Sequence, residues 1–135
     1  MTPPYRARAI VFDPEGRVLL VRGQGREPRW YFPGGGIEDG EMPYEAAQRE
    51  VLEETGVRVR DRAVFVGVED GHLYFATRTV SRKQYPSVLD PEAEIIDAGF
   101  YSIPDAIRML AGFPDAQRSK ISLVMLLRAQ NALLR

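Results

Sequence analysis

The first part of the chain carries apolar and polar positions in the order that predicts β-strands. Residues 5–12 and 17–22 form two such segments, and the intervening Asp13-Pro14-Glu15-Gly16 suits a type I turn. A short aromatic strand is expected at residues 30–32, directly before a glycine-rich run. The N-terminal part is therefore predicted to form a hairpin and a short third strand.

A second hairpin and a later strand are predicted downstream. Residues 63–68 and 72–80 flank Glu69-Asp70-Gly71, and Asp-Gly favours a tight hairpin turn because both positions tolerate positive φ. Residues 82–93 are expected to form a loop, and residues 95–102 the last strand.

Three helices are predicted from the spacing of apolar positions and from their end signals. The first spans residues 43–55, because Pro43 suits a first helical turn and Gly56 suits a left-handed C-cap. The others span residues 104–111 and 115–134. The apolar stripe of the last helix is predicted to contain Ile121, Val124, Met125 and Leu127. This order of elements predicts a single domain over residues 1–135, with an α/β or α+β fold and a mixed sheet between helices.

Composition excludes some classes of function before any motif is considered. The chain has 135 residues, 44% of them apolar, which suits one globular domain with a sizeable core. Because 18 basic and 19 acidic residues give a formal net charge of -1, no overall charge favours non-specific binding to nucleic acid or anionic membranes. The chain has no cysteine and no long apolar run. We therefore expect a soluble, cytoplasmic protein that binds its ligand at a local site.

Three glutamates crowd one face of the first predicted helix. Glu50, Glu53 and Glu54 lie at positions i, i+3 and i+4, so their carboxylates share one turn. Left unpaired, they repel by a few tenths of a kcal/mol per pair, and the helix dipole disfavours anions in the last turn by roughly 0.3–1 kcal/mol each. A divalent cation reverses both penalties. An all-carboxylate site without His or Cys selects hard ions such as Mg²⁺ or Mn²⁺.

The residues around this acidic face favour a phosphate ligand. Arg49 can reach Glu53 at i+4 and hold that carboxylate in place. Gly34, Gly35 and Gly36 lack Cβ atoms, so their loop can turn sharply and its backbone can approach a bound group. Together with a metal on the helix, that group is predicted to be a phosphate chain bridged by the cations.

The stretch from Gly35 to Val57 resembles a complete Nudix box. The specified positions of the box are filled by Gly35, Glu41, Arg49, Glu50, Val51, Glu53, Glu54, Gly56 and Val57. The order of the flanking elements also resembles the Nudix fold over nearly the whole chain. The resemblance implies an α/β/α sandwich that hydrolyses a nucleoside diphosphate linked to another moiety, with Mg²⁺ or Mn²⁺ held on the box helix.

The resemblance also implies a role for each matching residue. Glu50, Glu53 and Glu54 resemble the metal ligands, Arg49 their orienting partner, and Glu41 a supporting or water-mediated metal contact. Gly35 would supply the loop. The reaction implied is attack by a metal-activated water on one phosphorus of the diphosphate, with the cations stabilising the leaving phosphate.

The catalytic base is left open between a box glutamate and an acid on a later loop. Glu94 lies six residues before Phe100, where family members often carry such a glutamate, and Glu92 is the alternative. Met42 departs from the family pattern, because Ser or Thr is common at this N-cap position and Met offers no capping oxygen. The departure concerns the start of the helix and no metal ligand.

Substrate contacts are predicted on the strands before and after the box. Arg6 and Arg8 share a strand face and could meet phosphate or ribose, although solvent-exposed charges are the simpler explanation. Trp30 or Tyr31 could stack on a base. Tyr74 falls near the position where dinucleoside polyphosphate hydrolases of the family carry a tyrosine, but a buried strand aromatic also explains it.

His72 and Leu73 add little to the prediction of function. His72 is the only histidine, and we expect it to have a structural or solvent-facing role. Leu73 stands where many ADP-ribose hydrolases of the family carry a proline, so the resemblance does not point to that subgroup.

The primary hypothesis is a metal-dependent pyrophosphohydrolase with Mg²⁺ or Mn²⁺ as cofactor. Its expected partner is a small-molecule nucleotide: a nucleoside triphosphate, an oxidised nucleotide or a dinucleoside polyphosphate. Neither membrane binding nor stable nucleic-acid binding is expected, and a homodimer is compatible with the resemblance. The alternative is a non-catalytic Nudix-fold module that binds a nucleotide. Such a module would be free to lose box glutamates, whereas this chain keeps all four.

Overall fold

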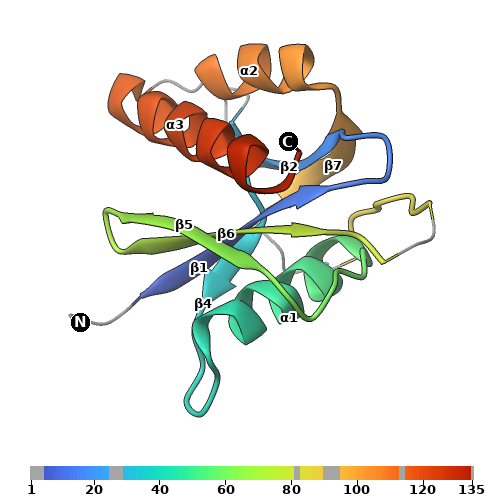
Figure 1. Ribbon diagram of the computed structural model, residues 1–135, viewed down its shortest axis with the longest axis vertical. Coiled ribbons are helices and arrows are strands. Elements are labelled where there is room, and N and C mark those ends of the chain that lie inside the picture. Colours follow the sequence, from blue (N-terminus) through green and yellow to red (C-terminus); the bar gives the residue numbers. More distant parts are fainter. Residues whose placement is uncertain (1–4, 25–28, 81–82, 90–94, 113–114, 135) are drawn as a thin grey trace.

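The computed structural model describes residues 5–24, 29–80, 83–89, 95–112 and 115–134. Within these residues a seven-stranded sheet has α2 and α3 on one face and α1 on the other (Figure 1). The predicted α/β/α sandwich with a mixed sheet is therefore confirmed. The strands are β1 (Arg6–Phe12), β2 (Val18–Gly23), β3 (Trp30–Tyr31), β4 (Gly34–Gly36), β5 (Val64–Glu69), β6 (His72–Arg78) and β7 (Ile95–Tyr101), and the helices are α1 (Pro43–Thr55), α2 (Ile103–Ala111) and α3 (Ala116–Leu133).

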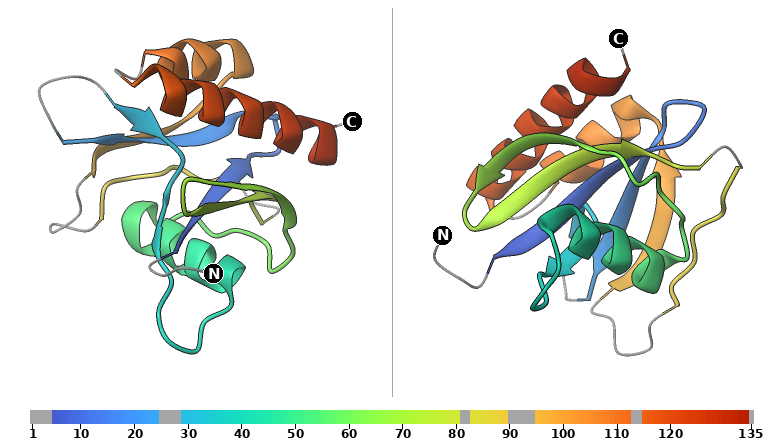
Figure 2. Two further views of the ribbon diagram at one scale, coloured as in Figure 1. Left: turned by 90° about the vertical axis from the view of Figure 1, so that its left-hand side faces the viewer. Right: turned by 60° about the horizontal axis from the view of Figure 1, so that its bottom comes forward.

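Strand β1 is the central element of the sheet. It pairs in parallel with β6 along its whole length, antiparallel with β4 at its start, and antiparallel with β2 at its end, where Phe12 lies opposite Val18. Strand β2 then diverges to pair with β3 and β7. Figure 2 shows the strands of the sheet between the helical layers. This topology places the start of β6 and the glycines of β4 beside the first residues of β1.

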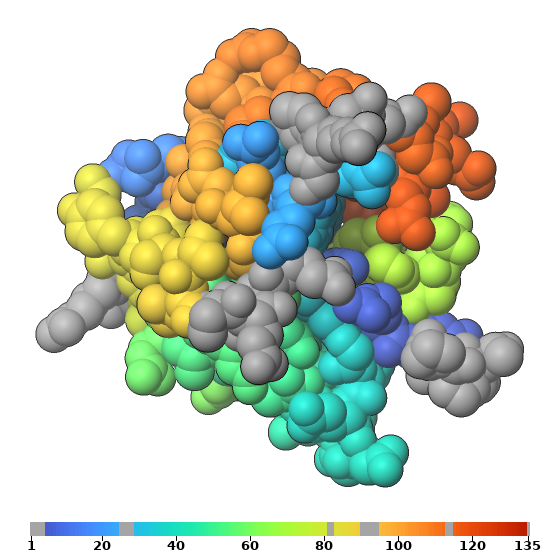
Figure 3. Space-filling view, turned by 180° about the vertical axis from the view of Figure 1, so that it is seen from behind, coloured from blue at the N-terminus to red at the C-terminus, as the bar shows by residue number. Residues whose placement is uncertain are grey.

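The alternation of side chains on β1 builds two separate cores. Ala7, Ala9 and Val11 belong to the cluster beneath α1, and Ile10 and Phe12 belong to the cluster beneath α2 and α3. Burial of a large apolar side chain such as Phe12 contributes roughly 1.5–3 kcal/mol, so these clusters hold the three layers together. Seen from behind, α2 and the start of α3 (orange) lie along the top of the molecule, and α1 with the loop before it (green to teal) lies along the bottom (Figure 3).

Helix α1 has the predicted bounds. Gly56 follows it with φ 75°, and its N–H donates to Leu52 O at 2.9 Å. At the other end Met42 supplies no capping oxygen, as expected, but the Glu45 carboxylate accepts the Met42 N–H at 2.9 Å. One N-terminal N–H group is thus satisfied by a residue of the first turn.

The second hairpin is also confirmed, because Asp70 and Gly71 adopt φ angles of 53° and 77° in the turn between β5 and β6. The predicted apolar stripe of α3 is partly wrong. Met125 is buried, but Val124 and Leu127 are 38% and 58% exposed. The helix is rotated so that Leu126 packs inward, because Met125, Leu126 and Ala129 together form the face that meets the sheet. No helix in the described part of the chain is both long and apolar enough to cross a membrane.

Candidate active site

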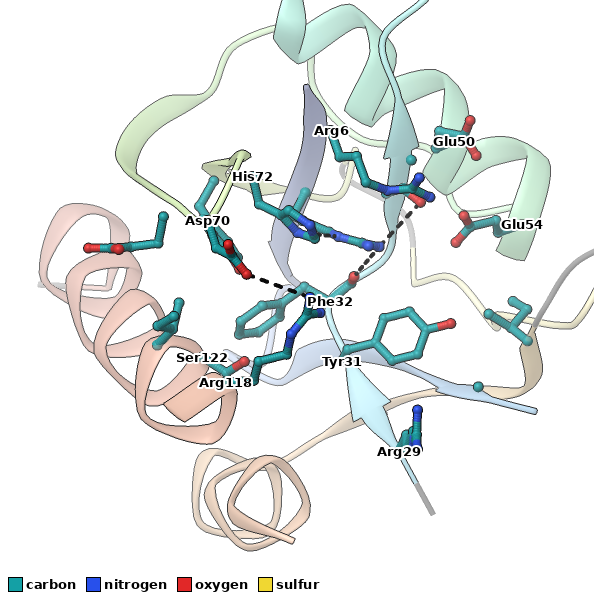
Figure 4. A pocket seen from close by; sticks show the side chains of 18 of the residues that line it. Arg6, Arg29, Tyr31, Phe32, Glu50, Glu54, Asp70, His72, Arg118 and Ser122 are labelled. Carbon is teal, nitrogen blue, oxygen red and sulfur yellow. Dashed lines mark hydrogen bonds and ion pairs between the residues drawn. The ribbon is translucent and has the colours of Figure 1, made fainter. Parts of the chain in front are cut away.

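A cavity of about 470 Å³ lies where the starts of β1 and β6, strand β4, the end of α1 and the first half of α3 meet. Figure 4 shows Glu50 and Glu54 together at one end of the cavity, with Asp70 and Arg118 at the other end. The charged side chains that line it are Arg6, Arg8, Arg29, Arg118, Glu50, Glu54, Glu69 and Asp70. Because arginines and carboxylates both line it, the cavity suits a ligand that carries negative charge together with a cation.

The structure brings two of the three predicted ligands to the cavity. Glu50 and Glu54 line it, whereas the Glu53 side chain is 54% exposed and accepts from Arg49 at 3.2 Å. Among the described residues, no three acidic or histidine side chains converge closely enough to hold a metal ion by themselves. The three carboxylates share a helical turn as predicted, but only two share the cavity.

Glu54 is the most perturbed acid of the site. Its Oε2 atom is buried and has no hydrogen-bond partner among the described residues. Burial, followed by the charge of Glu50, raises the pKa of the Glu54 carboxyl from 4.5 to about 8, although the Gly34 N–H and the charge of Arg8 partly oppose the shift. A buried carboxylate oxygen without a partner is a position where a cation is strongly favoured.

Arg49 organises the acidic residues around it. It donates to both carboxylate oxygens of Glu41, at 2.8 and 3.0 Å, and to Glu50 at 3.0 Å. It also donates to Gly36 O at 3.1 Å, which ties α1 to β4. These carboxylates raise the pKa of Arg49, so it remains charged, and Arg49 in turn lowers the pKa of Glu41. Glu41 therefore contacts Arg49 and lies outside the cavity lining. Glu50 both contacts Arg49 and lines the cavity.

Two glycines of β4 are required by close approach. A Cβ at Gly34 would lie 2.1 Å from Ala7 O, because β4 pairs tightly with β1. A Cβ at Gly35 would lie 2.5 Å from the carboxyl carbon of Glu50. The missing side chain at Gly35 is thus the space that the Glu50 carboxylate occupies, which explains the glycine in physical terms.

The donor set fits a hard divalent cation. Glu50 and Glu54 offer carboxylate oxygens only, and the unpartnered Oε2 of Glu54 supplies the buried charge that such an ion would neutralise. Mg²⁺ is commonly held by one or two carboxylates, with water and substrate phosphates completing its coordination. Two carboxylates at an open cavity are therefore a better match to Mg²⁺ or Mn²⁺ than to a fully enclosed structural ion.

Most of the predicted substrate contacts lie at the same cavity. Arg6, Arg8, Tyr74 and the three β4 glycines line it. Trp30 does not, because its ring packs edge-on against Tyr101 at a centroid distance of 5.3 Å, and Tyr31 lines the cavity instead. Glu92 and Glu94 lie outside the described residues.

The place of His72 in the cavity is not evident from the local sequence pattern. Its Nδ1 accepts a hydrogen bond from Arg8 Nε at 3.3 Å, and its ring stacks on Tyr74 at a centroid distance of 6.3 Å. The same holds for Arg118, which pairs with Asp70 at 3.6 Å across the other end of the cavity (Figure 4). The signal for His72 is the parallel register that places it opposite Arg6, and this register cannot be read from local periodicity.

Comparison with known sequences identifies the family. The NUDIX domain model matches residues 2–122. An RNA pyrophosphohydrolase of Saccharophagus degradans is 35% identical over 78% of this chain, and one of Dinoroseobacter shibae is 43% identical over 53%. The chain spans 62% of the length of the first relative and 46% of the second.

Solved structures agree on the fold. A NUDIX hydrolase from Nitrosomonas europaea superposes with a TM-score of 0.69 at 22% identity, covering 97% of this chain and 90% of its own. An ADP-ribose pyrophosphatase from Streptococcus suis superposes with a TM-score of 0.67 at 22% identity, covering 97% and 92%. With the family model spanning most of its length, and with Glu50 and Glu54 of the box placed at the cavity, the chain belongs to the NUDIX domain family.

Proposed function

We propose that this protein hydrolyses the diphosphate bond of a nucleoside diphosphate linked to another moiety. The observation that carries the proposal is the pairing of Glu50 and Glu54 at a cavity whose wall also presents Arg8 and Arg6. A phosphate chain lying in this cavity would meet arginines, and a cation between the chain and the glutamates would balance the remaining charge. The names of the sequence relatives support the same reaction class.

Glu50 and Glu54 would hold Mg²⁺ or Mn²⁺, with Glu53 as a third ligand if it turns away from Arg49. When bound, such a cation neutralises phosphate oxygens and lowers the pKa of a coordinated water. Arg49 holds the Glu50 carboxylate in place at 3.0 Å, while Gly35 leaves room for it. Arg8, which also lines the cavity, supplies positive charge to the phosphate chain.

The chemical step that we propose is attack of a water oxygen on one phosphorus. The new phosphorus–oxygen bond forms as the bridging bond breaks, and the bridging oxygen leaves with its electron pair on the second phosphate. The proton of the water passes to a carboxylate. The candidates for this base are a box glutamate and Glu94.

The 5′-triphosphate end of an RNA carries the same linkage as a nucleoside triphosphate. Relatives named RNA pyrophosphohydrolases favour it as a second candidate substrate. Arg118, at the end of the cavity away from the glutamates, is exposed and could contact a further nucleotide. The net charge of -1 argues that any such contact is local to the 5′ end.

A product analysis tests the proposal. Purified protein with Mg²⁺ is incubated with nucleoside triphosphates, oxidised triphosphates, ADP-ribose, dinucleoside polyphosphates and a 5′-triphosphorylated RNA oligonucleotide, in water enriched in oxygen-18. We expect nucleoside monophosphate or a monophosphorylated 5′ end as product, with label in the attacked phosphate and no turnover in EDTA. Binding of nucleotides without turnover of any substrate would contradict the proposal and favour the non-catalytic module.

A further inference from the structure

Arg8 is a cation held almost entirely by neutral groups. Its Nε donates to His72 Nδ1 at 3.3 Å, and its Nη1 donates to Phe32 O and Gly34 O, each at 3.4 Å. The guanidinium also lies over the Tyr31 ring, 5.4 Å from its centroid. Across the described ranges, no carboxylate lies within ion-pair distance of Arg8, and its Nη2 has no hydrogen-bond partner.

Such a partly buried charge favours an anion as its partner. Desolvation by burial lowers the pKa of Arg8, and the neighbouring charge of Arg6 lowers it further. A buried cation is costly unless it is paired, and carbonyl and imidazole acceptors compensate only part of the loss. Because Arg8 lines the cavity that contains Glu50 and Glu54, the anion would come from the ligand. A phosphate oxygen is the partner that a guanidinium fork matches best.

His72 fixes the direction of this fork. Since Nδ1 accepts the Arg8 Nε–H, the ring must be neutral with its proton on Nε2. Strand pairing brings the two together, because β1 and β6 run in parallel with Arg8 opposite Tyr74 and Arg6 opposite His72. The stacked Tyr74 ring supports the imidazole from one side. Burial and the charge of Arg8 lower the pKa of His72 to about 4, so the acceptor persists at neutral pH.

We propose that His72 is a positioning residue that holds Arg8 so that its free Nη2 faces a phosphate group of the substrate. The proposal rests on the proposed function only for which phosphate group is bound. The site would accept a phosphate oxygen from any phosphate compound. This role for His72 replaces the expectation that the residue is structural or faces solvent. A structural role would depend on the ring and its stacking on Tyr74, whereas positioning depends on the Nδ1 acceptor.

Two substitutions at His72 separate these roles. His72→Phe keeps an aromatic ring beside Tyr74 but removes the acceptor, and His72→Asn removes the ring but places an amide oxygen close to the position of Nδ1. Arg8→Met removes the guanidinium and Arg8→Lys keeps only its charge. Arg58→Met is the matched control, because Arg58 is exposed and lies outside the cavity lining. Circular dichroism and thermal unfolding identify variants that fold.

The first readout is calorimetric binding of inorganic pyrophosphate at a fixed Mg²⁺ concentration. Loss of charge-assisted hydrogen bonds in Arg8→Met is expected to weaken binding on the order of 10–100-fold, and loss of one neutral acceptor in His72→Phe by roughly three- to tenfold. His72→Asn should restore most of the affinity, and Arg58→Met should match the wild type. With a hydrolysed substrate, the loss in His72→Phe should appear mainly in KM.

The second readout is the Arg8 Nε–H resonance in nitrogen-15 NMR spectra. We expect its hydrogen exchange to be slow in the wild type and in His72→Asn, and fast in His72→Phe. Equal pyrophosphate affinity in wild type and His72→Phe, or weaker binding in His72→Asn than in His72→Phe, would overturn the positioning role. Unchanged affinity in both Arg8 variants would overturn the phosphate site. These results are separate from the proposed function, which fails if the wild type binds pyrophosphate but hydrolyses no substrate.

Discussion

The cavity has an acidic wall, which contains Glu50 and Glu54 of α1, and a basic wall, which contains Arg8 of β1. On each wall a charged side chain lacks a partner of opposite charge within the described part of the chain. On the α1 side, Glu54 has a buried carboxylate oxygen without a partner among the described residues, and its pKa is raised. On the β1 side, the partly buried guanidinium of Arg8 donates to carbonyls and a neutral imidazole, and its pKa is lowered. Both pKa shifts disfavour the charged form of the side chain. Neither the charged Glu54 nor the charged Arg8 is therefore stabilised by folding alone.

The difference between the walls indicates which kind of ligand can pair the charges on both. An anion alone would stabilise Arg8 but repel Glu50 and Glu54, and a cation alone would do the reverse. A phosphate chain that carries a divalent cation satisfies both walls at once. The separation of charge along the cavity is therefore a stronger argument for a metal-bound phosphate substrate than either wall considered by itself.

Substitution at the acidic wall is expected to give the largest effect. Glu54→Gln keeps the shape of the side chain but removes the charge that would hold the cation. Turnover should fall by more than about 100-fold, beyond the roughly 10–100-fold typical of residues that only support a metal ligand. The measurement is turnover of the best substrate at saturating Mg²⁺.

The matched control for this prediction is Glu45→Gln, an exposed glutamate on the same helix whose amide oxygen can still accept the Met42 N–H. It should leave turnover unchanged. Glu53→Gln is expected to lower turnover as well, since the family resemblance makes Glu53 a ligand although it contacts Arg49 in this structure. Wild-type turnover in Glu54→Gln would remove the acidic wall from the reaction.

Local patterns predicted the helix that carries the acidic residues, and they did not predict the contacts that hold Arg8. The bounds of α1 and the contact of Arg49 with Glu53 follow from helical spacing and end signals, which act over a few residues. The meeting of Arg8 with His72 depends on parallel pairing of strands that are 64 residues apart in sequence. Nothing in the local pattern fixes that register, so the sequence left Arg8 open between a phosphate contact and a solvent-exposed charge.

The same distinction explains smaller errors. Tyr31, and not Trp30, reaches the cavity because β3 is a two-residue strand whose orientation is set by pairing with β2 and by the Tyr101 ring. The face of α3 that packs inward is set by the shape of the sheet beneath it, and so the stripe prediction that included Val124 and Leu127 was wrong. Long-range packing decides such details, and a single sequence does not display it.

The β4 glycines lie between the two walls, and alanine at each position is expected to act differently. Gly34→Ala places a Cβ against the backbone of β1 and should destabilise the fold by about 1–3 kcal/mol or more. Gly35→Ala displaces the flexible end of Glu50, so turnover should fall by up to about 100-fold from misplacement, with stability changed by less than about 0.5 kcal/mol.

Gly36→Ala is the control in this series, because a Cβ there meets nothing within 4 Å. Urea unfolding and turnover measured on all three variants give the comparison. If Gly35→Ala kept full turnover, the position of Glu50 seen here would not be the one used in the reaction. Equal destabilisation at Gly34 and Gly36 would mean that the close pairing of β4 with β1 is not present in solution.

The smallest expected effect is a pair of opposite pH dependences of stability in metal-free protein. Glu54 binds its proton more tightly in the folded protein, because its pKa rises from 4.5 to about 8. Its contribution to the free energy of unfolding therefore falls as pH rises through that range. His72 binds its proton less tightly when folded, because its pKa falls from 6.5 to about 4, so its contribution is lost as pH falls from 6.5 towards 4.

Single variants separate these two contributions. Thermal unfolding is measured in EDTA from pH 4 to pH 8.5 for the wild type, Glu54→Gln and His72→Asn. Glu54→Gln should remove the decline towards pH 8, where His72 is largely neutral in both states, and His72→Asn should reduce the loss between pH 6.5 and 4. Glu50, Arg8, Arg6, Arg118 and Asp70 face these groups and are the same in all three proteins. A decline that persists unchanged in Glu54→Gln would place the raised pKa on another acid, and the two walls would then no longer be incomplete in opposite senses.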